Sequence, residues 1–194
     1  MNDDYSYFIY NISRLSYDQN GELIKEKINI GLSNGLYKYI GKEYKFANEC
    51  MNGSGYLVFP GSVDTIFFEE KENLLDDYIH ANFILRRKLK MGITAVFLKG
   101  AEKLIDLLND SQPVKVFKED FMNKNRINDL KGHLMGKNPI RFPNLNRNDF
   151  NSIEIGNNAD FYCVMDSLDQ PCFDLNYSDI INVFIDGKCV YDKN

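Results

Sequence analysis

Alternating apolar and polar positions in the first 59 residues predict β-structure. Three apolar or alternating runs suit extended strands: residues 5–10, 27–30 and 36–40. Asn34-Gly35 separates the last two runs, and this dipeptide in such a place is a strong signal of a two-residue hairpin. A short apolar run at 56–59 then ends at Pro60. We therefore expect residues 5–59 to form a set of strands.

The spacing of apolar residues becomes helical in the segment 74–89. Acidic residues occupy its first turns and basic residues its last turns, as the helix dipole favours, and Gly92 is suited to end the helix. Residues 93–98 form a near-continuous apolar run, which is typical of a parallel strand covered on both faces. A short helix at about 101–109 and a strand at 114–117 are expected next. This alternation predicts βαβ units.

Strand signals return near the C-terminus, after a weakly patterned segment at 119–150 that is rich in Asn and Lys. The expected strands are residues 152–155, 161–165, 181–185 and 188–191. Asp186-Gly187 separates the last two and predicts a second hairpin. The order along the chain is therefore β, then α/β, then β.

Composition narrows the class of protein. With 194 residues, 44% of them hydrophobic, the chain is long enough to bury its own core. The net charge of −5 argues against a nucleic-acid partner, because phosphate recognition needs basic clusters. No apolar run is long enough for a membrane span, and the acidic start at residues 1–5 is unlike a secretion signal. We expect a cytoplasmic protein that binds neither membranes nor nucleic acid.

Residues that ligate metals or act as nucleophiles are few and scattered. The four cysteines have no Cys-x-x-Cys spacing, and we interpret them as small buried hydrophobes: Cys50, Cys163, Cys172 and Cys189. His80 and His133 lie far apart and form no metal-binding pair. Gly31-Leu32-Ser33-Asn34-Gly35 matches the Gly-x-Ser-x-Gly pattern of a nucleophile elbow, but no helix is expected after it. We therefore assign this segment to the first hairpin.

One stretch resembles a known family. Tyr56-Leu57-Val58-Phe59-Pro60-Gly61-Ser62-Val63-Asp64 is similar to the first barrel strand of the amidohydrolase superfamily, whose pattern ends in Pro-Gly-x-(apolar)-Asp-x-His-x-His. Further segments resemble family motifs in the same order: residues 28–40, 89–96, 156–161 and 183–191. The resemblance implies hydrolysis of C–N bonds in cyclic amides and related small molecules, with metal ions that make hydroxide and polarise a carbonyl.

The chain departs from the family pattern at the metal ligands. Where the pattern has its two histidines, this sequence has Ile66 and Phe68, whose side chains offer no lone pair to a metal. About 85 residues separate the two β segments, whereas a complete barrel of eight βα units takes about 250 residues. The later ligands of the family come from strands that this chain has no room for, and Lys99 follows only the second strand.

These observations predict an α+β architecture in two parts. A composite β-sandwich is expected from residues 1–59 plus 150–194, with a reduced, partial barrel-like α/β insert at 60–149. An incomplete barrel exposes strand edges and apolar faces, which another molecule must cover. We therefore expect a homo-oligomer or a protein partner.

Three functions remain open from the sequence. The first is an amidohydrolase-like protein that has lost catalysis and acts by binding itself, a related enzyme or a small molecule. It would have no catalytic residue, metal or cofactor, and a residual pocket at Asp64, Ile66, Phe68 and His80. The second is an active hydrolase with a rebuilt site drawing on Asp64, His80, Asp160 and a cysteine. The third is an unrelated protein-interaction domain.

Overall fold

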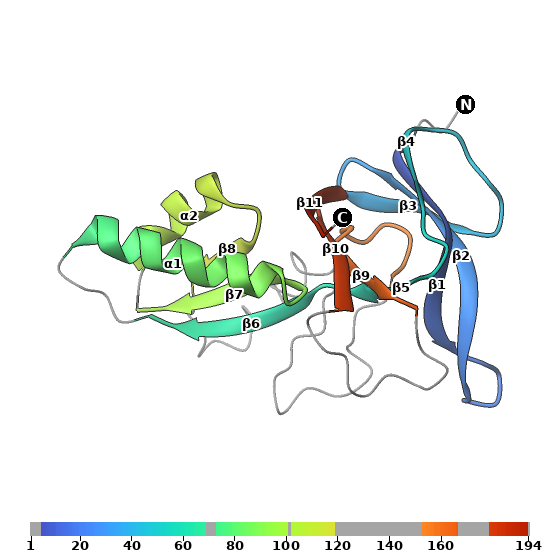
Figure 1. Ribbon diagram of the computed structural model, residues 1–194, viewed down its shortest axis with the longest axis horizontal. Helices are drawn as coiled ribbons and strands as arrows, with labels where there is room; N and C mark the ends of the chain where they lie inside the picture. Colours follow the sequence, from blue (N-terminus) through green and yellow to red (C-terminus); the bar gives the residue numbers. More distant parts are fainter. Residues whose placement is uncertain (1–4, 69–72, 101, 119–152, 167–178, 194) are drawn as a thin grey trace.

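The computed structural model contains two β-sheets (Figure 1). It describes residues 5–68, 73–100, 102–118, 153–166 and 179–193. The large sheet contains β1 (Tyr5–Tyr17), β2 (Leu23–Ser33), β3 (Leu36–Gly41), β4 (Ala47–Asn52), β5 (Tyr56–Pro60), β9 (Phe161–Met165), β10 (Ile180–Ile185) and β11 (Lys188–Asp192). The small sheet contains β6 (Ser62–Phe67), β7 (Ile93–Lys99) and β8 (Lys115–Lys118). The helices are α1 (Leu74–Leu89), the 3₁₀ turn η1 (Glu102–Leu104) and α2 (Ile105–Ser111).

The large sheet joins the two ends of the chain. Its strand order is β11-β10-β9-β5-β1-β2-β3, and β4 lies parallel to β1 off this path. The junction is the antiparallel pair of β5 and β9, from Tyr56 opposite Met165 to Pro60 opposite Phe161. The described strands, sheets and helices are compatible with the α+β class. The division at residues 59/60 and 149/150 stays a prediction.

Both expected hairpins are present. Asn34 and Gly35 have φ angles of 52° and 76°, and Asp186 and Gly187 have 49° and 71°. A two-residue hairpin turn of this kind needs positive φ at both positions, which Asn, Asp and Gly tolerate best. The Gly-x-Ser-x-Gly match is therefore a hairpin, since β2 ends at Ser33 and β3 begins at Leu36.

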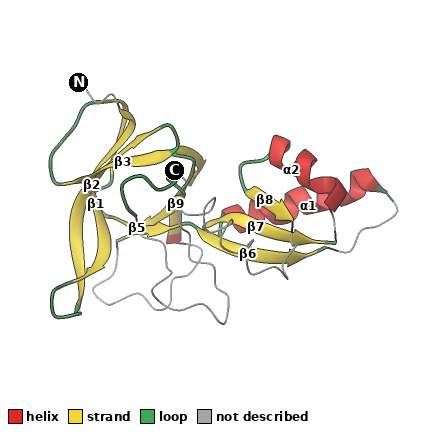
Figure 2. Ribbon diagram, turned by 180° about the vertical axis from the view of Figure 1, so that it is seen from behind, coloured by secondary structure: helices red, strands yellow, loops and turns green. Residues whose placement is uncertain are grey.

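The small sheet is parallel and carries both helices on one face (Figure 2). The helix α1 covers the span that its spacing predicted, and the side chain of Asn73 caps it by accepting a hydrogen bond from the Leu75 N–H. Residues 93–98 of β7 are all buried, as the continuous apolar run indicated. Neither helix in the described ranges combines the length and apolar character needed to cross a bilayer.

Three local predictions were wrong or incomplete. Residues 153–155 form no strand: Ile155 is exposed, and the chain turns at Gly156, where φ is 92°. The sequence analysis missed β4, whose polar residues lie on an edge strand with little burial. The stretch from Tyr56 to Asp64 is two strands rather than one, because the chain passes from the large sheet to the small sheet at Gly61.

Two apolar clusters fill the structure. One lies between the small sheet, the helices and one face of β5, β9 and β10; it includes Val96, Leu85 and Leu104. The other lies on the opposite face of the large sheet, around Phe161, Phe184 and Tyr37. The rings of Phe161 and Phe184 stack with their centroids 4.4 Å apart. The first cluster ties α1 and β6, which carry the expected site residues, to the large sheet.

Candidate functional site

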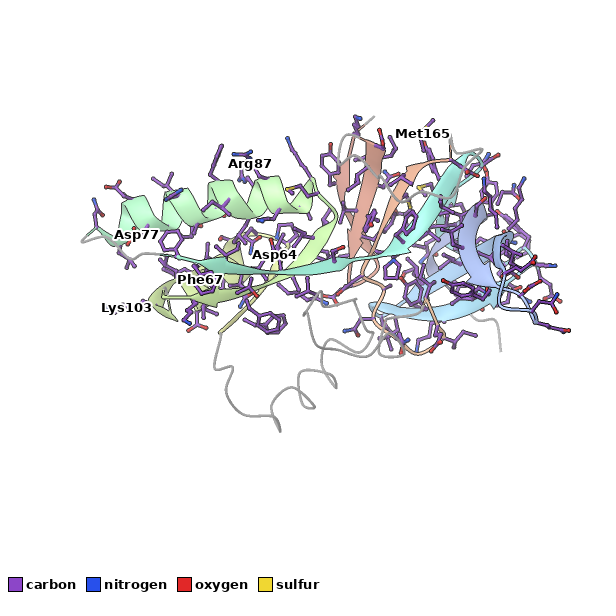
Figure 3. All side chains as sticks on the ribbon, turned by 90° about the horizontal axis from the view of Figure 1, so that it is seen from below. Asp64, Phe67, Asp77, Arg87, Lys103 and Met165 are labelled. Carbon is purple, nitrogen blue, oxygen red and sulfur yellow. The ribbon has the colours of Figure 1, made fainter. Side chains whose placement is uncertain are left out.

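The expected site residues lie where β6 meets α1. Asp64, Ile66 and Phe68 follow each other at every second position, so their side chains share one face of the strand. That face is the one toward α1, because Asp64 contacts Lys88 and Phe68 contacts His80, both on the helix. Figure 3 shows Asp64 between α1 and the small sheet. The four residues thus lie along the contact between one helix and one strand, but at two separate points, because Asp64 contacts Lys88 whereas Phe68 contacts His80, eight residues earlier in α1.

Ile66 and Phe68 are parts of the helix-facing core. Their side chains are only 8% and 7% exposed, and they belong to the same cluster as Ala81, Leu85 and Leu89 of α1. Burial of one such side chain stabilises the fold by about 1.5–3 kcal/mol. These two positions therefore stabilise the packing of helix on sheet, and they provide no group that could bind a metal.

Asp64 is held by an ion pair. The Nζ atom of Lys88 lies 2.5 Å from Oδ2 of Asp64, and the backbone N–H of Thr65 donates to Oδ1 over 2.8 Å. Both charged side chains remain partly exposed, at 26% for Lys88 and 35% for Asp64. The cation that this carboxylate contacts is thus a lysine from the last turn of α1.

His80 is an exposed residue of α1 beside Phe68. Its ring centroid is 5.6 Å from that of Phe68, and the two rings are tilted by 55°. A second histidine is needed for a typical zinc pair, but His133 lies outside the described residues. Within the described ranges, no three His, Cys, Asp or Glu side chains are grouped so as to hold a metal ion.

The direction of the side chains matters as much as their identity. In a (β/α)₈ barrel the helices form the outer ring, and residues that line the interior point away from them. In β6 the side chains that point away from the helices are those of Val63, Thr65 and Phe67, which alternate with the three residues facing α1. The pairing of β6 with β7 is irregular between Ser62 and Val63, and a slip of one residue exchanges the two faces of a strand.

A second charged group lies at the other side of the small sheet. The ammonium of Lys115 donates to Oδ2 of Asp160 over 2.8 Å and to Oδ1 of Asp186 over 2.7 Å. The backbone N–H of Asp186 donates to the other oxygen of Asp160 over 2.8 Å. Lys115 is paired with Ala95 of β7, which is paired with Val63 of β6, so these three side chains lie on the same face of the small sheet. Asp64 follows Val63 directly and therefore lies on the opposite face.

Burial dominates the chemistry of this lysine–carboxylate group. The side chain of Asp160 is 4% exposed, and burial raises the pKa of its carboxyl although Lys115 and the Asp186 N–H oppose this effect. Burial lowers the pKa of Lys115, but the two carboxylates together outweigh burial and raise this pKa above its usual value. The lysine therefore stays charged. It connects Asp160, directly before β9, with Asp186 in the β10–β11 turn.

The residues of the rebuilt-site hypothesis are not brought together. Asp160 bonds to Lys115 on one face of the small sheet, while Asp64 and His80 lie on the helix side. Cys163 is fully buried, which raises the pKa of its thiol and keeps it protonated. The interpretation of the cysteines as buried hydrophobes is wrong for Cys50 and Cys189, which are exposed, and Cys172 lies outside the described residues. A pocket at the four predicted residues stays a prediction.

Sequence reasoning missed Lys115 and Asp186 as partners of Asp160. The signals were present but weak: Asp160 precedes a strand, and Asp186 begins the Asp-Gly turn. Lys115 alternates with buried valines at 114 and 116, which gives it the direction opposite to that of the helix-facing core. A lysine alone in such a run is a hint that a carboxylate lies opposite.

Comparison of the sequence with protein-family models and with curated proteins finds no match. Comparison of the structure with solved structures finds partial likenesses. An N-acyl-D-glutamate deacylase from Bordetella bronchiseptica is 22% identical over 50% of this chain and 19% of its own, with a TM-score of 0.36. A Xaa-Pro dipeptidase is 17% identical over 58% of this chain and 32% of its own, with a TM-score of 0.46. An uncharacterized protein is 16% identical over 58% and 31%, with a TM-score of 0.49.

The matches span less than a third of those proteins.

Proposed function

We propose that this amidohydrolase-related chain has lost metal-dependent hydrolysis and acts by binding another molecule. The observation that carries the proposal is the place of Ile66 and Phe68. They occupy the positions of the family's first two metal ligands, they have no donor atoms, and both are buried against α1. Hydrolysis of an amide near neutral pH needs an activated water, which a metal ion supplies in this family.

The contacts of Asp64 support the same conclusion. Its two carboxylate oxygens accept hydrogen bonds from Lys88 and from the Thr65 N–H. A cation at this place would compete with the ammonium group of Lys88, and positive charges at such a distance repel each other strongly. The ion pair thus gives the carboxylate a structural role in joining β6 to α1.

Within this proposal, the large sheet corresponds to the composite β-sandwich of the family and the small sheet to a barrel reduced to three strands. The parallel order β6-β7-β8, with helices between successive strands, supports this correspondence. A reduced barrel keeps the apolar packing of helices on strands but leaves out the strands that would supply the remaining ligands. We propose a binding protein on this basis, and its cytoplasmic location stays a proposal from the sequence alone.

Hydrolysis assays on the purified full chain test the proposal. The substrates are cyclic amides such as hydantoin and dihydroorotate, supplied with and without added Zn²⁺, and the matched control is the variant Asp64→Asn. We expect the same rate of ring opening as in buffer for both proteins. Turnover that a chelator abolishes and that Asp64→Asn lacks would show a rebuilt active site and refute the proposal.

A further inference from the structure

The outer side of α1 carries a line of exposed apolar side chains. Leu75, Ile79 and Phe83 are spaced four residues apart, which places them in one row along the helix. Their side chains are 63%, 57% and 58% exposed, although they are among the largest apolar residues of the helix. The side that packs on the sheet is a different one, formed by Asp77, Ala81, Leu85 and Leu89.

Such a row is uncommon on a helix side that no other described part of the chain buries. Single exposed apolar residues are normal, but a continuous apolar patch on an otherwise polar surface marks an interaction site. The helix has 16 residues and is about 24 Å long, so the row of three spans roughly half of it. It is long enough to pack against another helix through ridges of residues four apart.

Side chains of opposite charge lie at the two ends of this apolar row. Asp76 is exposed in the first turn of α1, and the exposed Arg86, Arg87 and Lys90 lie at its end. The guanidinium of Arg87 is 5.8 Å from the ring centroid of Phe83. Figure 3 shows Arg87 on the side of the helix away from the sheet. The row is therefore acidic at its start and basic at its end.

We propose that α1 binds α1 of a second copy of this chain in an antiparallel pair, with a two-fold axis near Ile79. Leu75 then packs against the partner subunit's Phe83, and Ile79 against the partner subunit's Ile79. A two-fold axis uses the same patch on both subunits and so covers the apolar row of each.

The charges select both the partner and the orientation. In the antiparallel pair, Asp76 lies near the partner subunit's Arg87. Side chains on a helix lean toward its N-terminus, so these two side chains lean toward each other. A parallel pair would place the acidic residue beside its own copy and the basic residues beside theirs, which is repulsive. A row that is complementary to itself only when reversed fits a second copy.

The interface gives the proposed binding role a partner, and in that sense it rests on the proposed function. The two stand on different residues, however. A dimer that hydrolyses cyclic amides would refute the loss of catalysis and leave the α1 interface intact, whereas an inactive monomer would refute only the interface.

Sedimentation equilibrium of the full chain tests the pairing. The wild-type chain of 22.5 kDa is expected to reach the mass of a dimer at micromolar concentration. The variant Ile79→Lys places two ammonium groups on the two-fold axis and should raise the dimer Kd about tenfold or more. Its matched control is Ile155→Lys, since Ile155 is an equally exposed isoleucine, 63%, outside the helix. Circular dichroism confirms that both variants fold, as exposed positions should allow.

Exchange of the charges tests the orientation. The single variants Asp76→Arg and Arg87→Asp should each weaken the dimer, and the double variant should recover most of the loss because the pair is restored in reverse. A wild-type monomer at all concentrations would overturn the interface. So would a dimer that Ile79→Lys leaves unchanged, or two charge variants whose effects simply add.

Discussion

At the scale of single residues, Lys115 lies between two carboxylates, one of them buried. It holds Asp160, which is nearly inaccessible to water, and Asp186, which lies in an exposed turn. A buried carboxylate without a cation is costly, so the lysine has a larger effect on stability than an ordinary surface charge. Its contacts join β8 of the small sheet to β9 and β10 of the large sheet.

Replacement of this lysine should destabilise the protein. We expect Lys115→Met to lower the free energy of unfolding by about 2–4 kcal/mol at pH 7, because Asp160 keeps its burial and loses its cation. Urea unfolding followed by circular dichroism measures the loss. The matched control is Lys45→Met, which breaks an exposed ion pair with Glu43 and should leave the unfolding midpoint unchanged.

The loss of unfolding free energy in Lys115→Met should become smaller as the pH falls. Burial already raises the pKa of Asp160 above its usual value, and removal of Lys115 raises it further. A folded state with a raised pKa binds the proton more tightly than the unfolded state, so acidification through that pKa stabilises the fold. Unfolding of Lys115→Met at a series of pH values should therefore approach wild type as the pH is lowered. A constant difference at every pH would contradict the assignment of the loss to Asp160.

At the scale of elements, the direction of the β6 side chains decides what the family positions can do. Asp64, Ile66 and Phe68 face α1, while Phe67 faces away and is 73% exposed. Restoring the family's residues by substitution would thus place two imidazoles in the helix-facing core. Neither would line the interior of a barrel.

The double variant Ile66→His/Phe68→His should lose stability without gaining a metal site. Removing two buried apolar side chains and burying two polar rings should cost about 2–5 kcal/mol for each position. Thermal unfolding with and without Zn²⁺ measures both effects at once. Phe67→His is the control, and it should unfold close to the wild-type temperature. An increase in the melting temperature of the double variant on addition of Zn²⁺ would contradict this account of β6.

Gly61 is the second element-scale feature, because it separates β5 from β6. A Cβ atom at this position would lie 2.4 Å from Oγ1 of Thr94 and 2.5 Å from its Cγ2. We expect Gly61→Ala to lower the stability by about 1–3 kcal/mol, as overpacked sites do. Addition of Thr94→Ala should relieve most of the loss at Gly61, and the absence of any relief would contradict the steric cause.

The amphipathic helix and the hairpins were predictable because local signals fix them. The spacing of apolar residues located α1, and Asn34-Gly35 and Asp186-Gly187 located two turns that need positive φ. Pro60-Gly61 indicated where the strand at 56–59 ends, but the pattern alone could not show that the chain changes sheet there, because this change follows from contacts with Thr94 and Asp160. The false strand at 153–155 has strand-forming residues but no neighbouring strand to pair with in the described residues.

The candidate site, like the fold, was predictable from the sequence only in part. The sequence located Ile66 and Phe68 at the family's ligand positions, but it could not give the face on which they lie. A bulge or a one-residue slip changes that face without changing the pattern, and the pairing of β6 with β7 is irregular at Ser62/Val63. Lys88 as the partner of Asp64, 24 residues further along the chain, depends on how α1 packs on the strand.

At the scale of the whole molecule, strands from both ends of the chain build one sheet, and the segment between them builds the other (Figure 1). The pairing of β5 with β9 and the three charged groups at Lys115, Asp160 and Asp186 connect these parts. The chain thus packs its helices on parallel strands and attaches them to the large sheet. The proposed binding role uses these parts and needs no metal ion.

The central claim is that this scaffold no longer holds a catalytic metal, and a calorimetric titration of the 194-residue, metal-free chain with Zn²⁺ tests it most directly. The account predicts no stoichiometric binding that depends on Asp64, so wild type and Asp64→Asn should give the same titration. One zinc ion bound per chain in wild type, with affinity lost in Asp64→Asn, would contradict it.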